Sequence, residues 1–209
     1  CSALLWRTWW SNSGGVPANF KNYFALVFDQ PFVSASVWSD KELKEGVLEL
    51  ADNHVGALVR FKAAARGDRV HFRVASSFIS PEQAELNLKE LGDDAFDMLC
   101  EKGRQAWNGA LGRIAVEGGT LDQTRVFYTC LYRSLLFPRA LWETDASGRV
   151  VHYSPSTGEV KPGYYYTDTG FWDTFRSLFP LLNFLYPSVN AKMAAGLEAC
   201  ARESGWLPE

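Results

Sequence analysis

The chain has 209 residues, of which 47% are hydrophobic and 22% are charged. This composition is typical of a folded protein and excludes a disordered chain. The formal net charge of −3 provides no basic surface for a nucleic-acid backbone or an anionic membrane. No apolar run reaches the length of about 18 residues that a membrane span needs. Aromatic residues are abundant, at 14% of the chain.

The residues before Ser80 predict β-structure, because short apolar and β-branched runs alternate with polar turns. In the last run, Val70, Phe72 and Val74 alternate with polar residues, which predicts that these three side chains lie on a buried face. The last two runs are expected to form a hairpin through residues 65–68. The predicted strands are Tyr23–Phe28, Phe32–Trp38, Val55–Phe61 and Arg69–Ser76. Short strands at this spacing indicate an antiparallel sandwich rather than a parallel sheet.

From Ser80 onward the apolar period changes from 2 to 3.6, which predicts helices. Ser80 and Thr120 each precede a glutamine by three residues, as in a capping box. A short β segment is expected between Trp142 and Tyr165. The expected helices run from Pro81 to about Leu91, from Phe96 to Ile114, from Leu121 to Pro138, from Phe171 to Pro187, and from a cap at Ser188 or Asn190 to Gly205.

The cysteines and histidines do not form a recognisable catalytic or metal-binding motif. Cysteines stand at Cys1, Cys100, Cys130 and Cys200, without a CxxC pair, and are interpreted as buried free thiols, with a disulfide as the alternative. The three histidines are too far apart in the sequence to indicate a triad, and His71 is expected to be solvated. We predict no metal site from these residues.

One segment, from Tyr164 to Arg176, combines two carboxylates with several aromatic side chains. Sugar sites use this combination, because aromatic faces pack on the C–H face of a pyranose while carboxylates bind its hydroxyl groups. The segment predicts Asp173, Trp172 and Asp168 as substrate-binding residues. The structural alternative is that Asp168 caps a helix and Trp172 belongs to the core.

The same segment resembles glycoside hydrolase family 92, the calcium-dependent exo-α-mannosidases. The resemblance extends, in the same order, over most of the chain from Tyr23 onward. Its motifs are Tyr23-Phe24-Ala25-Leu26, residues 80–88, Ala106-Trp107-Asn108, residues 114–119, residues 128–139, Tyr166-Thr167-Asp168, Trp172-Asp173-Thr174-Phe175-Arg176 and Gly205-Trp206-Leu207-Pro208.

This resemblance implies an α+β multidomain protein in which a β-sandwich is followed by linker helices and an (α/α)6 toroid. The implied divisions are residues 1–79 for the C-terminal part of the sandwich, 80–119 for the linker helices and 120–209 for the first helices of a truncated toroid. The site would lie between sandwich and toroid, and the chain would be a central fragment of a longer enzyme.

The resemblance also implies an inverting exo-α-mannosidase that acts on α-mannoside glycans, and a bacterial periplasmic, secreted or cell-surface location. Asp173 would contact the hydroxyl groups of the mannose in the −1 subsite, beside Trp172. The catalytic acid and base, and the ligands of a calcium ion, would come from segments beyond Glu209, so the fragment would depend on missing parts of its own chain as partners.

Two other functional classes remain open. A non-catalytic carbohydrate-binding or structural protein could use the same scaffold without the chemistry. A helical regulator or partner-binding module is suggested by the adjacent Trp9 and Trp10.

The implied fragment status predicts that the 209 residues alone hydrolyse nothing. An inverting glycosidase needs two carboxylates about 6.5–9.5 Å apart. Asp168 and Asp173 would project about 140° apart on a common helix, so they cannot both face one sugar unless Asp168 lies outside that helix. Incubation of the purified chain with α-mannobiose and calcium tests this, and released mannose would contradict it.

Overall fold

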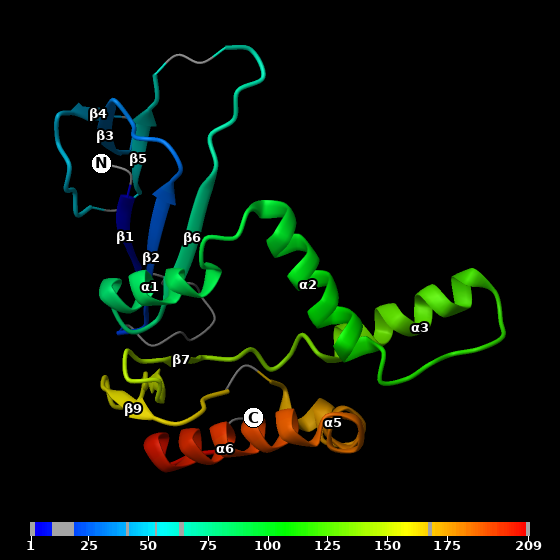
Figure 1. Ribbon diagram of the computed structural model, residues 1–209. Coiled ribbons are helices and arrows are strands. Elements are labelled where there is room, and N and C mark those ends of the chain that lie inside the picture. Colours follow the sequence, from blue (N-terminus) through cyan, green and yellow to red (C-terminus); the bar gives the residue numbers. More distant parts are fainter. Residues whose placement is uncertain are drawn as a thin grey trace.

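The computed structural model describes residues 3–9, 19–40, 42–52, 54–62, 65–166 and 169–207, and it describes only the backbone of residues 3–9. Strands form the N-terminal part of this chain and helices dominate the C-terminal part (Figure 1). A small third sheet, within residues 142–162, is inserted among the helices. The predicted mixture of antiparallel sheets followed by helices is therefore confirmed. The domain boundaries and the toroid remain predictions.

The first sheet, sheet A, contains the longest predicted strand run. Its strands are β1 (Ala3–Trp9), β2 (Lys21–Phe28) and β6 (Phe72–Ser77), in the order β1-β2-β6 and all antiparallel. The dense run of β-forming residues in β2 places this strand at the centre of the sheet. The strand β1 was not predicted.

The second sheet, sheet B, corrects the predicted hairpin. Its strands are β3 (Ser34–Ser39), β4 (Glu42–Glu45) and β5 (Val55–Arg60), in the order β4-β3-β5. The hairpin prediction was wrong because β5 pairs with β3, whereas β6 pairs with β2 in sheet A. The residues between β5 and β6 therefore connect two sheets. Strands pair through backbone groups that every residue carries, so the sequence of a strand does not show which other strand it pairs with.

The predicted buried face of β6 was also wrong. The side chains of Phe72 and Val74 are 59% and 49% exposed, whereas Arg73 on the opposite face is partly buried. The guanidinium of Arg73 donates to the carbonyl oxygens of Gly92 (2.5 Å) and Asp94 (3.2 Å). These carbonyls follow the short helices α1 (Pro81–Leu88) and η1 (Lys89–Leu91), of which α1 packs on β6 and β2. The polar face is thus covered by helix and loop.

Both predicted N-terminal caps are present, but they differ in detail. The Ser80 hydroxyl accepts the backbone N–H of Gln83 at 3.1 Å, and Pro81 occupies the first turn of α1. The Gln83 side chain does not complete a capping box, because it donates to the carbonyl of Thr144 instead. Thr120 and Gln123 form the complete box at the start of α3 (Leu121–Ser134).

Helix α2 (Phe96–Leu111) is confirmed, although much of its apolar stripe is exposed. Only its C-terminal end reaches the core, where Leu111 contacts the main cluster. The cysteine prediction was consequently wrong for Cys100 on α2 and Cys130 on α3, which are exposed, and correct for Cys200, which is buried. Apolar periodicity marks one face of a helix but does not show whether another element covers it.

The predicted β segment forms a third antiparallel sheet. Its strands are β7 (Trp142–Thr144), β8 (Val150–Tyr153) and β9 (Val160–Pro162), with β8 in the centre. Glu143 joins this sheet to the N-terminal part of the chain: it accepts the Phe78 backbone N–H at 2.8 Å and the Asn87 amide at 2.7 Å. We call this contact region, which includes the Gln83–Thr144 hydrogen bond, the junction.

Three helices replace the single helix expected from Phe171 to Pro187 and the helix after it. They are α4 (Phe171–Thr174), α5 (Leu178–Leu185) and α6 (Pro187–Ser204). A continuous helix would require a Pro180 N–H to bond Arg176, and proline has none. Pro180 instead lies in the first turn of α5. The main core cluster consists of Leu131, Tyr166, Leu182, Tyr186 and Met193.

The ends of α6 were predicted with mixed success. Pro187 begins the helix, and Ser188 and Asn190 lie inside it, so neither of these residues is the N-cap. The expected terminating glycine is present, since Gly205 adopts the left-handed conformation with φ of 81°. None of the described helices combines the length and the apolar character needed to cross a membrane.

The approach of α6 to the Tyr165–Tyr166 backbone yields a stability prediction. A Cβ at Gly196 would lie 2.8 Å from the Tyr166 nitrogen and 3.1 Å from the Tyr165 carbonyl carbon, so backbone would have to move. We expect Gly196→Ala to destabilise the chain by about 1–3 kcal/mol. The matched control is Gly103→Ala in α2, where a Cβ meets nothing within 4 Å and should stabilise by up to about 1 kcal/mol. Urea unfolding of both variants measures this, and equal shifts would contradict it.

Candidate functional site

The predicted substrate-binding residues Trp172 and Asp173 lie on α4. This single turn begins after Gly170, whose carbonyl accepts the Thr174 hydroxyl at 2.9 Å and the Thr174 N–H at 3.1 Å. Both bonds fix the turn locally, so α4 presents its side chains from a defined backbone. Asp168, the third predicted residue, lies outside the described residues.

The carboxylate of Asp173 is exposed and accepts no hydrogen bond from a described residue. A structural aspartate usually has such a partner, because its ionised oxygens are strong acceptors. Gly170 leaves space beside it, since a Cβ there would lie 3.5 Å from Asp173 Oδ2. The carboxylate is therefore available to hydroxyl donors from solvent or a ligand.

Trp172 is not a core residue, because its side chain is 72% exposed. The Arg176 guanidinium lies 5.1 Å from the ring centroids of both Trp172 and Phe175. The Phe175 ring in turn stacks with Phe171 at 6.3 Å. The indole is thus held against a cation and an aromatic group while one part of its surface stays open, which suits stacking on a sugar ring.

The residues before the site are held by the core and by the third sheet. Trp142 Nε1 donates to the Tyr166 hydroxyl at 3.0 Å, and the Tyr165 ring stacks on His152 at 4.5 Å with an interplanar angle of 15°. Gly196 lies against the backbone of the same two tyrosines. These contacts fix the chain shortly before α4.

A buried pair, His152 and Glu203, was missed by the sequence analysis. The imidazole has no exposed surface; its Nδ1 lies 2.9 Å from the Gly163 carbonyl and its Nε2 lies 3.0 Å from Glu203 Oε1. Because a carbonyl can only accept, Nδ1 is the donor to Gly163, and Nε2 faces the Glu203 carboxylate. No local motif signals this pair, because 51 positions separate its members.

Tyr165 has a perturbed hydroxyl group. Burial of the phenol, and then its hydrogen bond to the Cys200 sulfur at 3.7 Å, raise the pKa of Tyr165 well above its usual value. The phenol therefore remains neutral in ordinary conditions. It contributes packing under the site rather than charge.

The described residues do not supply a metal centre. Within these ranges, no three histidine, cysteine, aspartate or glutamate side chains gather in a geometry that could hold an ion. Calcium needs six to eight oxygen ligands, which Asp173 alone cannot provide. A calcium ion would therefore need ligands from outside the described residues.

Sequence profiles identify the family to which these features belong. The profile of the glycosyl hydrolase family 92 N-terminal domain matches residues 6–77, and that of the family 92 catalytic domain matches residues 83–209. The chain belongs to glycosyl hydrolase family 92. The two matches meet at the junction, next to the Ser80 cap.

Solved structures of family 92 enzymes agree with this assignment. The inverting mannosidase BT2199 of Bacteroides thetaiotaomicron is 42% identical to this chain, with a TM-score of 0.93. The match covers 100% of this chain and 28% of the BT2199 chain. The family 92 glycosyl hydrolase ccman5 is 27% identical, with a TM-score of 0.78. The match covers 89% of this chain and 25% of the ccman5 chain. No curated protein sequence shows significant similarity. The chain thus spans about a quarter of the length of these solved family 92 structures.

The buried Tyr165 predicts a specific alkaline response. Its folded pKa lies above the usual 10.0, so its contribution to stability is complete below about pH 10 and is lost as the pH rises further. We expect the urea midpoint to fall less steeply between pH 9.5 and about 11.5 in Tyr165→Phe than in the unaltered chain.

The control for this experiment is Tyr132→Phe, which removes a phenol that is 39% exposed. The urea midpoint of Tyr132→Phe should fall with rising pH as steeply as that of the unaltered chain. Equal slopes for all three proteins would show that Tyr165 ionises with the same pKa in the folded and unfolded states.

Proposed function

We propose that this chain contributes the junction and the first catalytic-domain helices of an inverting exo-α-mannosidase. The observation that carries the proposal is the 42% identity, over the whole chain, with an enzyme described as an inverting mannosidase. The substrates would be α-mannosides such as N-glycan or mannan chains. The proposed location is the bacterial periplasm or cell surface, where such glycans are encountered.

The proposed role of Asp173 is to bind hydroxyl groups of the mannose in the −1 subsite. Its carboxylate accepts no hydrogen bond from the part of the chain that the structure describes, so binding a sugar breaks no hydrogen bond to those residues. Trp172 beside it would pack on the C–H face of the same sugar, and Asp168 is proposed to complete the group. The geometry of Asp173 and Trp172 supports binding by these residues, not proton transfer.

The acid and base of the inverting reaction are proposed to come from parts of the enzyme that this chain does not span. One carboxylic acid must protonate the leaving oxygen while a carboxylate on the opposite side activates water. In the described part of the chain, α4 carries one carboxylate, that of Asp173, whereas the inverting reaction needs two. The calcium ligands are proposed to lie in the same remaining parts.

The test is Asp173→Asn in the intact enzyme. Loss of a charge-assisted hydrogen bond costs about 1.5–3 kcal/mol, and kcat/KM on α-mannobiose should fall at least about 100-fold if that bond strengthens in the transition state. Asp122→Asn, at an exposed carboxylate in the first turn of α3, is the matched control and should leave kcat/KM unchanged.

Three outcomes separate the candidate functions. A large loss confined to Asp173→Asn supports the proposal. Near-normal turnover by that variant overturns the assignment of Asp173. An intact protein that binds mannosides but releases no mannose would instead show a non-catalytic carbohydrate-binding protein on this scaffold.

A further inference from the structure

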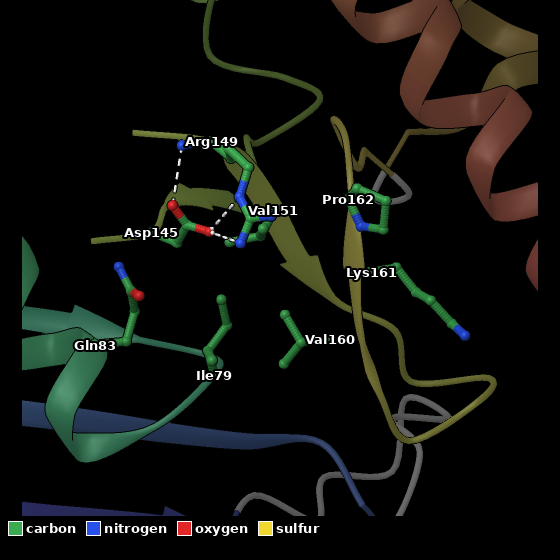
Figure 2. A pocket seen from close by; sticks show the side chains of 8 residues that line it. All are labelled: Ile79, Gln83, Asp145, Arg149, Val151, Val160, Lys161 and Pro162. Atoms are coloured by element: carbon green, nitrogen blue, oxygen red, sulfur yellow. Dashed lines mark hydrogen bonds and ion pairs between the residues drawn. The ribbon is translucent and has the colours of Figure 1, made fainter. Parts of the chain in front are cut away.

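A cleft lies at the junction, away from α4. Figure 2 shows its lining, which comes from the end of sheet A, from α1 and from the third sheet. Its volume of about 400 Å³ is within the range of ligand pockets, which often occur where two structural units meet. We call it the junction cleft.

The junction cleft is separated from the Trp172–Asp173 site by the length of α6. His152 of β8 contacts Glu203 near the C-terminal end of this helix, whereas Asn190 near its N-terminal end contacts Asn183 of α5. An 18-residue helix is about 27 Å long. Figure 1 shows β9 and α5 at opposite ends of α6. The two sites are therefore distinct.

Gln83 places an amide oxygen in the junction cleft. The residue is 8% exposed, and its Nε2 donates to the Thr144 carbonyl at 2.7 Å and to Asn87 Oδ1 at 2.9 Å. The Thr144 carbonyl can only accept, which fixes the orientation of the amide. Its oxygen accepts nothing from the described residues and faces the other lining side chains (Figure 2). An amide oxygen that opens into a cleft in this way can accept a hydrogen bond from water or a ligand.

Next to Gln83, the lining of the cleft carries two charged side chains that neutralise each other. Arg149 Nε and Nη2 donate to Asp145 Oδ2 at 3.0 and 2.9 Å, so the two charges cancel. Hydrogen bonds from the Ser147 hydroxyl and from the Arg149 backbone N–H hold the pKa of Asp145 well below its usual range. Arg149 Nη1 takes no part in this pair, and within the described ranges it donates to no other residue, so a ligand could accept from it.

The remaining walls are largely apolar. Ile79, Val151, Val160 and Pro162 form the part of the lining beside Gln83 and the Asp145–Arg149 pair (Figure 2). Lys161 directs its ammonium away from them, onto Glu159. A fitting ligand has an uncharged body with C–H groups, at least one hydroxyl donor for Gln83 and an acceptor for Arg149. An anion gains little here because Arg149 is already neutralised.

We propose that the junction cleft is a second carbohydrate-binding site, which holds one neutral sugar residue of a glycan. A pyranose supplies the required combination, since it has an apolar C–H face and hydroxyl groups that both donate and accept. The site would hold a glycan without performing chemistry on it. It does not depend on the role proposed for Asp173.

The experiment is an NMR titration of the chain with methyl α-mannoside, followed through the methyl signals of Ile79 and Val151. The blocking variant is Val160→Trp, which fills the cleft without removing any hydrogen bond of Gln83 or Arg149. The matched control is Val74→Trp on β6, because Val74 is also on a strand and has the same exposure of 49%. Sodium glucuronate at equal ionic strength is the anionic comparison.

The proposal expects saturable methyl shifts with methyl α-mannoside, a loss of affinity of at least about 10-fold in Val160→Trp, and unchanged affinity in Val74→Trp. Absence of shifts, equal binding by both tryptophan variants, or tighter binding of glucuronate would overturn it. The indole N–H signal of Trp172 is followed in the same titration. Shifts of this signal without methyl shifts at Ile79 and Val151 would support the α4 site and refute the junction cleft, so the two proposals fail separately.

Discussion

The carboxylate of Glu143 joins the strand-rich and helical parts of the described chain. It accepts the backbone N–H of Phe78 as the chain leaves β6 and the amide of Asn87 on α1. An ionised carboxylate can only accept, so both donors are satisfied by one residue from a distant strand. Successive side chains on a strand point to opposite faces, and the adjacent Trp142 accordingly binds Tyr166 in the helical core. The short strand β7 thus fixes sheet A and α1 relative to the core on which the α4 site rests.

The sequence predicted the features that depend on neighbouring residues. Ser80 and Thr120 cap helices because a hydroxyl one position before a helix can reach the N–H groups of its first turn. Gly205 ends α6 because glycine adopts positive φ without strain. Features that depend on distant residues were not predicted. The partner of β6, the exposure of Cys100 and the bond between Gln83 and Thr144 are decided by elements far along the chain, so local periodicity carries no information about them.

The candidate site shows the same division. Trp172 and Asp173 were identified from one contiguous motif, and the structure places both on one exposed turn. The His152–Glu203 pair and the stacking of Tyr165 on His152 join β8, α6 and the segment before α4. Nothing in the alternation of β8 distinguishes a buried histidine with a carboxylate partner from a solvated one. The contacts that support α4 were therefore not predictable, and the substrate-binding role of Trp172 and Asp173 stays a prediction.

The two proposed sugar contacts differ in the charge that they offer, and this difference assigns them different tasks. Catalysis requires an interaction that is stronger in the transition state than in the ground state. The carboxylate of Asp173 accepts no hydrogen bond from the described residues. In the proposed role it would strengthen its hydrogen bonds to the sugar as the hydroxyl groups become more acidic beside a developing positive charge. The Asp145–Arg149 pair at the junction cleft is already neutralised and held by further hydrogen bonds, so it would contact a sugar equally well throughout a reaction. Such a site can retain a glycan but cannot accelerate its hydrolysis. With α6 between them as a rigid spacer, the α4 site is suited to contact the reacting residue and the junction cleft to hold another part of a branched or extended glycan.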